Sequence, residues 1–407
     1  MSVLIAGAGI GGLTLALSLD AIGQDVLVLE AVPELRPLGV GINLQPHAVK
    51  ELDALGLLPA LDRIGLRTQG VGYFSSHGRE IWSEKRGLAA GYRWPQFSVH
   101  RGDLQMMLLD AARERLGQDR VVTGCAVQGW AENAGQIRVE TSRGAHTADL
   151  LVAADGIHST ARARLWPDEG PPLWNGILMW RGTTWAKPFL DARTMAMIGC
   201  KARKFVCYPI AERDGQVLVN WIADLRYPDS HAWAREDWNR PGRAADLMPH
   251  FGDWRFDWID VPALIEGAEA IFEWPMVDRD PLPRWSHGRM TLLGDAAHPM
   301  YPIGSNGASQ AILDARVLAR KARDQGAVPG ALAAYEAERR PRTSAIVLAN
   351  RGDGPDRVLD IVEARAPQGF EQLSDVIGQA ELHEIAAGYK ATAGMDIKAL
   401  NAAPPIL

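Results

Sequence analysis

The sequence is poor in cysteine and has no cysteine pairs that suggest a disulfide framework or a metal site. Its 407 residues include only Cys125, Cys200 and Cys207, an odd number without metal-ligand spacing. Small secreted proteins that depend on disulfides usually carry an even, closely spaced set. The sequence therefore predicts no metal site, and it favours a reduced, cytoplasmic protein in which each cysteine is a small core residue.

The sequence also lacks basic runs and long membrane-type segments. Its net charge is −6 and its pI is near 6.0, which disfavours nucleic-acid or anionic-membrane binding. The uncharged run 2–19 has no basic residues before it, and glycine fills four of the six positions 7–12. Neither a signal peptide nor a membrane helix favours so much glycine, so we expect a strand and a helix there and no membrane partner.

Repeats and low-complexity segments are missing as well, and the composition, 47% hydrophobic and 23% charged, is that of an ordinary enzyme. One hydrophobic core usually stops growing at roughly 250–300 residues. The length of this chain therefore predicts two domains.

A glycine-rich turn follows the first apolar strand. Gly7, Gly9 and Gly12 form a G-x-G-x-x-G pattern that also contains Gly11, an apolar helix comes next, and the following strand ends at Glu30. The glycines let a pyrophosphate approach the helix N-terminus, and the acid can accept hydrogen bonds from ribose hydroxyls. This arrangement predicts a dinucleotide site. The acid would repel a 2′-phosphate, so FAD or NAD fits the site and NADP does not.

A second strand, turn and helix lie near residue 300. Apolar residues up to Leu293 predict a buried strand, and Asp295 then presents a carboxylate suited to a polyol hydroxyl. Helical spacing of apolar residues begins at Ala308, directly after Gly304 and Gly307. The free N–H groups of this helix, with a charge of roughly half a proton, would point into the turn and favour an electron-rich ring.

Together these two motifs resemble the class A aromatic hydroxylases, the FAD-dependent monooxygenases related to para-hydroxybenzoate hydroxylase. The resemblance implies that Asp295 binds the ribityl chain of FAD and that the helix after Gly307 faces the pyrimidine edge of the flavin. It also identifies 155–162 as the family's middle motif, in which Asp155 is associated with FAD and the nicotinamide donor.

The resemblance assigns two arginines, Arg36 and Arg101, to FAD, and it places Gly41 where the chain passes beneath the flavin. From the residues alone, Arg36 could equally be a solvated surface arginine, and Arg101 could pair with Asp103.

The patterns and the resemblance predict an α/β fold in three parts. Residues 1–70, 99–170 and 276–344 would form a discontinuous, Rossmann-like FAD-binding domain. Residues 71–98 and 171–275 would form an inserted antiparallel-sheet substrate domain, followed by a C-terminal helical segment, 345–407. We see no chemistry in that last segment, and its end looks loosely ordered.

Most of the 14 tryptophans lie between Trp166 and Trp285, on expected strands. Core packing is the ordinary reason for such aromatic residues, but a planar substrate would also find its walls here. Tyr208 and Arg181 are the polar residues on these strands that we expect to face the substrate, and they are the candidate catalytic residues.

Within the family, residues 36–43, 179–182 and 276–283 resemble the phenazine hydroxylase branch. Asn43 stands where the hydroxynicotinate branch carries a histidine base, and an amide is no base at neutral pH. None of the ten histidines lies in a group that demands catalysis, and we expect His298 to position its turn. A fused or N-heteroaromatic carboxylate or phenolate that needs no deprotonation is the expected substrate.

The resemblance implies that NADH or NADPH reduces FAD, that O2 then forms a C4a-hydroperoxide, and that its distal oxygen passes to an aromatic carbon. A flavin halogenase or reductase of the same fold is one alternative, although the chain has no Trp-x-Trp-x-Ile-Pro. A non-catalytic binder of planar aromatic compounds is another. We expect the aromatic substrate and O2 as partners, no nucleic acid, and a monomer or homodimer.

Overall fold

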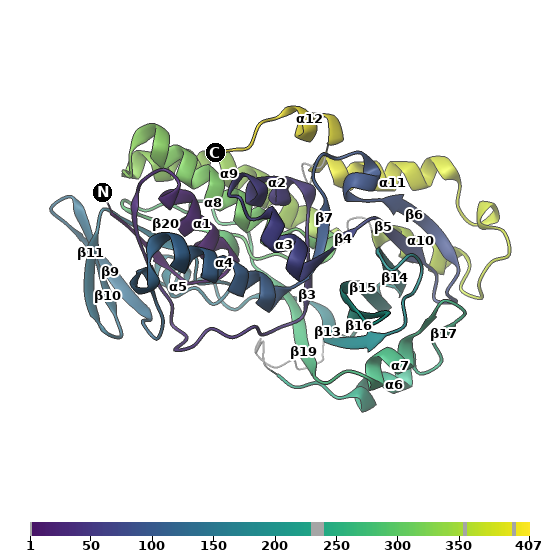
Figure 1. Cartoon of the computed structure of the whole chain (residues 1–407). Coiled ribbons are helices and arrows are strands. Elements are labelled where there is room, and N and C mark those ends of the chain that lie inside the picture. Colours follow the sequence, from purple (N-terminus) through teal and green to yellow (C-terminus); the bar gives the residue numbers. More distant parts are fainter. Residues whose placement is uncertain (1, 229–239, 353–355, 393–395) are drawn as a thin grey trace.

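The computed structural model describes residues 2–228, 240–352, 356–392 and 396–407. Two sheets organise it. Figure 1 shows a parallel sheet with its helices in one lobe, and a larger sheet with the C-terminal helices α10 (Arg357–Arg365) and α11 (Gln379–Thr392) in the other. Within the described residues, no helix is both long enough and apolar enough to cross a bilayer.

The first lobe is built on a five-stranded parallel sheet. In spatial order its strands are β20 (Met290–Leu292), β12 (Leu150–Ala153), β1 (Ser2–Ala6), β2 (Asp25–Leu29) and β8 (Val121–Val122). These strands are apolar runs, as a sheet covered on both faces requires. Because β1 pairs with both β2 and β12, the turns that follow these three strands meet at one edge of the sheet.

Helices cover this sheet and join it to the rest of the chain. They are α1 (Ile10–Asp20), α2 (Pro46–Ala54), α3 (Leu58–Ile64), α4 (Arg101–Leu116), α5 (Thr160–Leu165), α8 (Gly307–Gln325) and α9 (Pro329–Arg351). Helix α1 packs between α4 and α8 and is buried over most of its length, which explains its nearly uninterrupted apolar sequence.

Two three-stranded antiparallel sheets flank the parallel one. The first consists of β3 (Gly41–Leu44), β7 (Gln96–His100) and β4 (Gly65–Thr68), with β7 in the middle. The second consists of β9 (Val127–Asn133), β10 (Gln136–Thr141) and β11 (Gly144–Ala148). The first of these sheets carries Gly41 and Asn43 toward the second lobe.

The second lobe is built on a seven-stranded sheet. Its strands, in order, are β19 (Ile271–Asp278), β13 (Leu173–Ala186), β16 (Gln216–Arg226), β15 (Arg203–Arg213), β14 (Thr194–Cys200), β5 (Gly70–Phe74) and β6 (Glu80–Lys85). All neighbours are antiparallel except β14 and β5. On one face lie α6 (Ala244–Phe251), α7 (Val261–Glu266) and the short pair β17 (Arg255–Phe256) and β18 (Ile259–Asp260).

Helix α9 continues through a proline, where a helix usually ends or kinks: it passes Pro341 and reaches Arg351. Proline removes one helical hydrogen bond, but Thr343, Ile346 and Val347 beyond it are buried, so packing outweighs that loss.

The last residues are also held in place, although we expected them to be loosely ordered. Residues 403–407, which we term the terminal strap, follow α12 (Ile397–Ala402) and lie across α2 and α8. Lys50 Nζ donates to the Ala403 carbonyl at 2.7 Å, and the Glu51 carboxylate accepts from the Ile406 N–H at 3.0 Å. Arg316 donates to the Leu407 carbonyl.

Candidate active site

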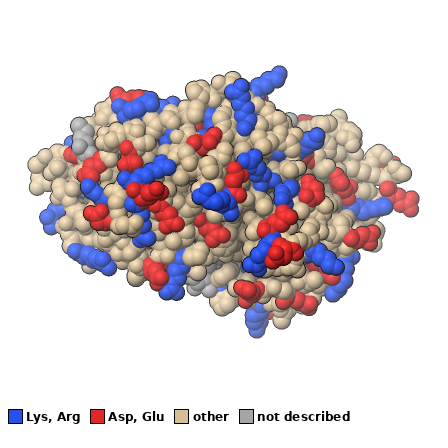
Figure 2. All heavy atoms as spheres, in the orientation of Figure 1, with Lys and Arg blue, Asp and Glu red and all other residues tan. Residues whose placement is uncertain are grey.

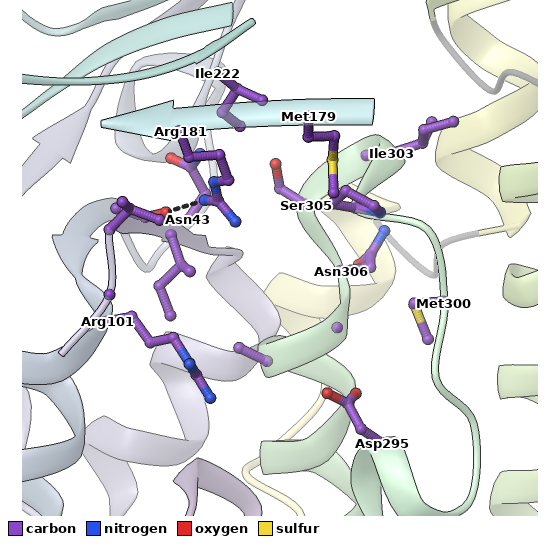
Figure 3. Close-up of a pocket in the computed structure, with 18 of the residues that line it drawn as sticks. Asn43, Arg101, Met179, Arg181, Ile222, Asp295, Met300, Ile303, Ser305 and Asn306 are labelled. Atoms are coloured by element: carbon purple, nitrogen blue, oxygen red, sulfur yellow. Dashed lines mark hydrogen bonds between the residues drawn. The ribbon is translucent and has the colours of Figure 1, made fainter. Parts of the chain in front are cut away.

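A cavity of about 370 Å³ lies between the two lobes. Its lining comes from the turns after β1, β12 and β20, from the start of α8, and from one face of the seven-stranded sheet. Figure 3 shows Arg101 and Asp295 at one end of the cavity, and Arg181 and Asn43 at the other, below the sheet. The site therefore joins both predicted halves of the molecule.

The four glycines after β1 have different surroundings. A Cβ on Gly12 would lie 2.0 Å from the Gly7 carbonyl oxygen, and one on Gly7, where φ is +105°, would lie 2.4 Å from the Ala154 oxygen. A Cβ on Gly11 would meet Leu293 at 2.7 Å. Gly9 lines the cavity and has no other atom within 4 Å of its Cβ position. Gly7, Gly11 and Gly12 therefore shape the turn, while Gly9 leaves space for a ligand.

The peptide of Ala8 in this turn is held from two sides. The Glu30 carboxylate accepts from the Ala8 N–H at 2.7 Å and from the Val32 N–H at 2.9 Å. Gln105 Nε2 donates to the Ala8 carbonyl at 2.8 Å. Glu30 thus stands beside the glycine turn, and its assignment to the ribose stays a prediction. We missed Gln105, although it lies four residues after Arg101 and so on the same face of α4.

Asp295 lies in the 3₁₀ turn η3 (Gly294–Ala296), and its side chain is exposed to the cavity. Desolvation by the surrounding protein raises the pKa of this carboxyl, while the nearby His298 and Arg101 act in the opposite direction. Arg101 stands at the start of α4 and also lines the cavity. Both residues are therefore brought together as the sequence suggested.

A buried network holds the turn that carries Asp295. The Asp314 carboxylate accepts from His298 Nε2 at 2.5 Å, from the Gly294 N–H at 3.2 Å, and from Arg339 Nε at 2.6 Å. These contacts connect α8 to the turn and α9 to α8. His298 accordingly positions the turn, in agreement with its expected role.

The middle motif braces the same turn from the other side. Asp155 accepts from the Thr160 N–H at 2.9 Å, and Ser159 caps α5 by accepting from the Arg162 N–H, also at 2.9 Å. The buried Arg162 side chain donates to the Ala297 carbonyl at 2.9 Å. The backbone on both sides of Asp155 lines the cavity, but its carboxylate is engaged with α5.

The N-terminus of α8 opens into the cavity. Gly304 and Ser305, in the turn η4 (Ile303–Ser305), both have positive φ, +71° and +55°, and α8 then begins at Gly307. No side chain caps this helix, and the Cβ position of Gly307 has no neighbour within 4 Å. Gly304, Gly307 and Ala308 all line the cavity. The positive end of a 19-residue helix therefore faces it.

Arg36 lies apart from the cavity in this structure. Its side chain is 66% exposed and forms an ion pair with Glu34 at 2.6 Å. This is the surface position that the residues alone allowed, and its assignment to the cofactor stays a prediction.

Gly41 is the point at which the two lobes are joined. Its carbonyl oxygen accepts from Arg181 Nη2 at 2.7 Å and from the Tyr208 hydroxyl at 2.8 Å, and its N–H donates to Asn220 Oδ1 at 2.6 Å. A Cβ on Gly41 would lie 2.7 Å from that of Asn220, so only glycine fits. We term these contacts the Gly41 clamp.

Both candidate catalytic residues belong to this clamp. Burial raises the pKa of Tyr208 to about 12, so its phenol stays protonated and donates at neutral pH. Burial also lowers the pKa of Arg181, whose guanidinium lies 5.2 Å from the centre of the Trp274 ring. Tyr208 is thus a hydrogen-bond donor and not a base.

The seven-stranded sheet has one face toward the cavity and one toward its own core, because strand side chains alternate. Trp180, Trp221 and Phe205 lie on the core face with Phe251 and Trp254. The cavity face consists mainly of other residues, and methionines are prominent among the cavity lining: Met179, Met195, Met197, Met276 and Met300.

Trp180, Trp221 and Trp254 are thus core residues, which is the ordinary role expected for aromatic residues on these strands. Among the described residues only Trp274 lines the cavity; Trp233 and Trp238 lie outside the described residues. The sequence shows that these strands are aromatic, but the strand register decides which face each residue takes.

A buried charged cluster, which we missed, completes the cavity face. Lys204 Nζ lies 2.6 Å from Asp356 Oδ2 and 3.4 Å from Asp224 Oδ2, and all three residues line the cavity. Burial alone would lower the pKa of Lys204, but the two carboxylates outweigh this effect and raise it. Lys204 is four residues before Tyr208, so strand alternation could have placed it. Asp356 belongs to the C-terminal segment, which we had expected to hold no chemistry.

The residues present fit FAD. The space beside Gly9 and Gly307 is open where a side chain would close it, and both α1 and α8 begin at the cavity without a side-chain cap. Asp295 and Arg101 add one acceptor and one donor group between these helix ends. Backbone N–H groups at two helix N-termini suit a pyrophosphate and an electron-rich ring.

Comparison with known proteins gives consistent relatives. A family model described as an FAD binding domain matches residues 1–227 and 260–350. The phenazine 1,6-dicarboxylic acid hydroxylase PhzS of Lysobacter antibioticus is 49% identical over 361 residues, which cover 86% of this chain and 89% of that protein. The aurachin C monooxygenase/isomerase of Stigmatella aurantiaca is 34% identical over 351 residues, with coverages of 85% and 87%.

A solved structure shares the fold over nearly the whole chain. Klebsiella pneumoniae HpxO, determined with FAD and uric acid, superposes with a TM-score of 0.76 at 26% identity, and covers 99% of this chain and 97% of its own. The family match extends over well over half of the sequence, and the named relatives are monooxygenases and hydroxylases. The chain therefore belongs to the class A FAD-dependent aromatic hydroxylases and is a flavoprotein monooxygenase that consumes NAD(P)H and O2.

Proposed function

We propose that this enzyme hydroxylates a fused or N-heteroaromatic substrate that carries a carboxylate or phenolate. Arg181 is the observation that supports this proposal. Its guanidinium is partly buried above an apolar cavity, and among the described residues no carboxylate forms an ion pair with it. A desolvated guanidinium binds a carboxylate strongly and with defined geometry. Two relatives are named for aromatic acids: the PhzS hydroxylase for phenazine 1,6-dicarboxylic acid, and a 29% identical monooxygenase of Bordetella bronchiseptica for 6-hydroxynicotinate.

The proposed cofactor residues fall into two groups. Gly9, Arg101 and Asp295, with the α8 N-terminus at 304–308, line the cavity and would contact FAD directly. Gly7, Gly11, Gly12 and Glu30 would shape the turn that receives the pyrophosphate. When bound, the flavin supplies the redox chemistry and activates O2. The N-terminus of α8 offsets negative charge on the reduced ring.

The protein's own part in the reaction is positioning. Arg181 would hold the acidic group of the substrate, while the methionine side chains give an adaptable apolar wall that excludes water. The Gly41 clamp holds β3 against the seven-stranded sheet. This contact would fix the distance between the two sides of the cavity. Asn43, buried beside Ser98, can donate or accept a hydrogen bond without acting as a base.

Three further proposals concern organisation. We assign the FAD-binding domain to residues 1–70, 99–170 and 276–344 and the substrate domain to 71–98 and 171–275. NADH or NADPH would approach the flavin transiently, since the one complete dinucleotide fingerprint serves FAD. The three free thiols support a reducing, cytoplasmic setting, and the enzyme would be a monomer or homodimer.

The test is a comparison of Arg181→Met with Tyr208→Phe, using a fused heteroaromatic carboxylate and its carboxamide. Both variants lose one hydrogen bond to the Gly41 carbonyl, but only the first loses the positive charge. A charge-assisted hydrogen bond contributes about 1.5–3 kcal/mol, so Arg181→Met should raise KM for the carboxylate roughly tenfold to a hundredfold, with little change for the carboxamide. Coupled turnover of a simple benzoate at a higher kcat/KM than any fused ring would overturn the proposal.

A further inference from the structure

We propose that Asp224 and Asp356 form a second polar subsite, which accepts a hydrogen bond from an N–H or O–H group of the aromatic substrate. This inference rests on the proposed function, because it concerns the same cavity and the same substrate. It narrows the proposed substrate class to aromatic acids that also carry an N–H or O–H donor on the ring system. Lys204 is the positioning residue of the subsite.

The fold brings this cluster together from three separate segments. Lys204 on β15 is paired directly with Asp224 on β16, and Asp356 arrives immediately before α10. Asp224 is 2% exposed and Asp356 9% exposed. One ammonium group therefore offsets two carboxylates, which leaves one net negative charge in the cluster.

Each carboxylate uses only one of its oxygens. Oδ2 of both residues faces Lys204, whereas Oδ1 of Asp224 and Oδ1 of Asp356 are buried and make no hydrogen bond within the described structure. A buried charged oxygen without a partner is costly, by about 1–3 kcal/mol or more, and native proteins rarely leave one so. A donor on a bound ligand would satisfy this need at the moment of binding.

The position of the cluster relative to Arg181 indicates which ligands fit. Arg181 is paired with Ile222 on the neighbouring strand, and Asp224 lies two residues further along on the same face. Such diagonal neighbours have Cβ atoms about 7 Å apart. The cavity thus has a positive group and a net negative group separated by about the width of a ring. An aromatic acid with a donor across the ring from its carboxylate matches both.

The experiment uses the FAD-loaded enzyme without NAD(P)H and measures ligand affinity from the change in flavin absorbance. The probes are a quinolone carboxylate with a free ring N–H and its N-methyl analogue. The variants are Asp224→Asn and Asp356→Asn. Asp278→Asn is the control, because Asp278 is a buried acid of the same sheet that pairs with Arg351 and does not line the cavity.

We expect the wild type to bind the N–H ligand about tenfold more tightly than the N-methyl ligand, which corresponds to about 1.4 kcal/mol. Both cavity variants should lose most of this preference, and the control should keep it. FAD content and Tm show whether each variant is folded. If Asp224→Asn does not retain FAD, Asp356→Asn, which lies outside the sheet, provides the same comparison.

Two results would overturn the proposed subsite while leaving the proposed substrate class in place. Equal affinities of the wild type for the two ligands, or an unchanged preference in both variants, would show that the cluster serves only to join the C-terminal segment to the sheet. In that case the carboxylate preference that depends on Arg181 would be unaffected. Failure of both quinolones to bind would instead overturn the proposed substrate class, and this subsite with it.

Discussion

The glycines of the turn after β1 differ in the space around their Cβ positions. Substitution by alanine can therefore distinguish an effect on folding from an effect on cofactor binding. Gly9→Ala places a methyl group in open space at an ordinary φ of −77°, whereas Gly12→Ala drives it into the Gly7 carbonyl. We expect Gly9→Ala to leave the stability of the FAD-free protein within about 0.5 kcal/mol of wild type. Its FAD affinity should fall at least tenfold, because the methyl group would occupy the space proposed for the pyrophosphate.

Gly12→Ala, by contrast, should lower both quantities. Urea unfolding of the FAD-free protein and fluorescence titration with FAD measure the two effects independently. Retention of full FAD affinity by Gly9→Ala would contradict the assignment of this turn to the cofactor.

A buried histidine provides a second residue-scale prediction. His47 is 5% exposed, both ring nitrogens lack partners within the described structure, and burial lowers its pKa to about 4 from the ordinary 6.5. The unfolded chain therefore binds a proton between these two values while the folded chain does not. The contribution of His47 to the free energy of unfolding is therefore fully present above pH 6.5. It falls by at most about 3 kcal/mol as the pH decreases toward 4.

We expect His47→Gln to flatten the decrease in unfolding free energy between pH 7 and pH 4.5, as measured by urea titration. His146→Gln, at a half-buried residue of the largely exposed strand β11, is the control for the substitution of histidine by glutamine. Parallel curves for wild type and His47→Gln would show that other groups carry the acid sensitivity.

At the scale of elements, helix α5 and the turn η3 depend on one arginine. Arg162 is 1% exposed and donates to the carbonyls of Ala296 and Ala297, and it pairs with Glu169. Arg162→Met leaves these carbonyls without their donor and removes one of the two arginines that pair with Glu169, the other being Arg279. A loss of about 3–5 kcal/mol in stability is expected for a broken buried ion pair. FAD affinity should also fall because Asp295 lies in the same turn.

Arg164→Met is the matched control for this prediction. Arg164 is on the same short helix but exposed, and its guanidinium stacks on Trp130 at 4.7 Å. This variant should change Tm only slightly and should bind FAD normally. A similar loss of FAD in both variants would mean that α5 as a whole, and not the contact of Arg162 with the turn, supports the site.

The sequence predicts those site residues whose positions follow from the strand or helix next to them in the chain. Gly7 to Gly12 and Glu30 follow strands, and Asp295 and Gly307 precede a helix, so local patterns place them at the cofactor edge. Tyr208 and Arg181 were correctly placed on strands that face the cavity, but their shared partner, Gly41, lies over a hundred residues away. The clamp could not be predicted, because it depends on how the lobes meet.

The same reason explains the failures. Trp180 and Trp221 point into the core because of the strand register, which no local pattern reveals. Asp356 follows an unremarkable stretch of sequence, and its partner in the cavity, Lys204, lies 152 residues earlier. Gln105 and Lys204 could have been found by helical or strand spacing from residues that we had already chosen.

On the scale of the whole molecule, the C-terminal region ties the two lobes together. The segment from Asp356 packs against the seven-stranded sheet, and the terminal strap returns to α2 and α8 in the other lobe. Figure 1 shows this path in yellow along one side of the molecule. These contacts of the C-terminal region therefore join the two lobes outside the cavity as well. Figure 2 shows positive and negative groups interspersed over the face in view.

Deletion of residues 403–407 should lower Tm with and without FAD. The deletion removes the packing of Ile406 and Leu407 against the hydrophobic core of the first lobe. It also exposes the Glu51–Arg316 ion pair, which is buried in the intact chain. Burial of one large apolar side chain contributes about 1.5–3 kcal/mol, so a loss of this size is expected. Lys398→Ala, an exposed residue on α12, is the control. An unchanged Tm after the deletion would show that the strap adds nothing to stability.

Alternation along the seven-stranded sheet has a consequence for how such an enzyme can change over time. On β15 and β16 the even-numbered residues 204, 206, 208, 222 and 224 line the cavity, and the odd-numbered neighbours 205, 207, 221 and 223 are in the core. Residues that contact the substrate cavity and residues that specify the fold thus alternate along the same two strands. A library that varies the cavity residues Val206 and Ile222, which belong neither to the Gly41 clamp nor to the charged cluster, can search for new substrates while the odd-numbered core residues continue to specify the same fold.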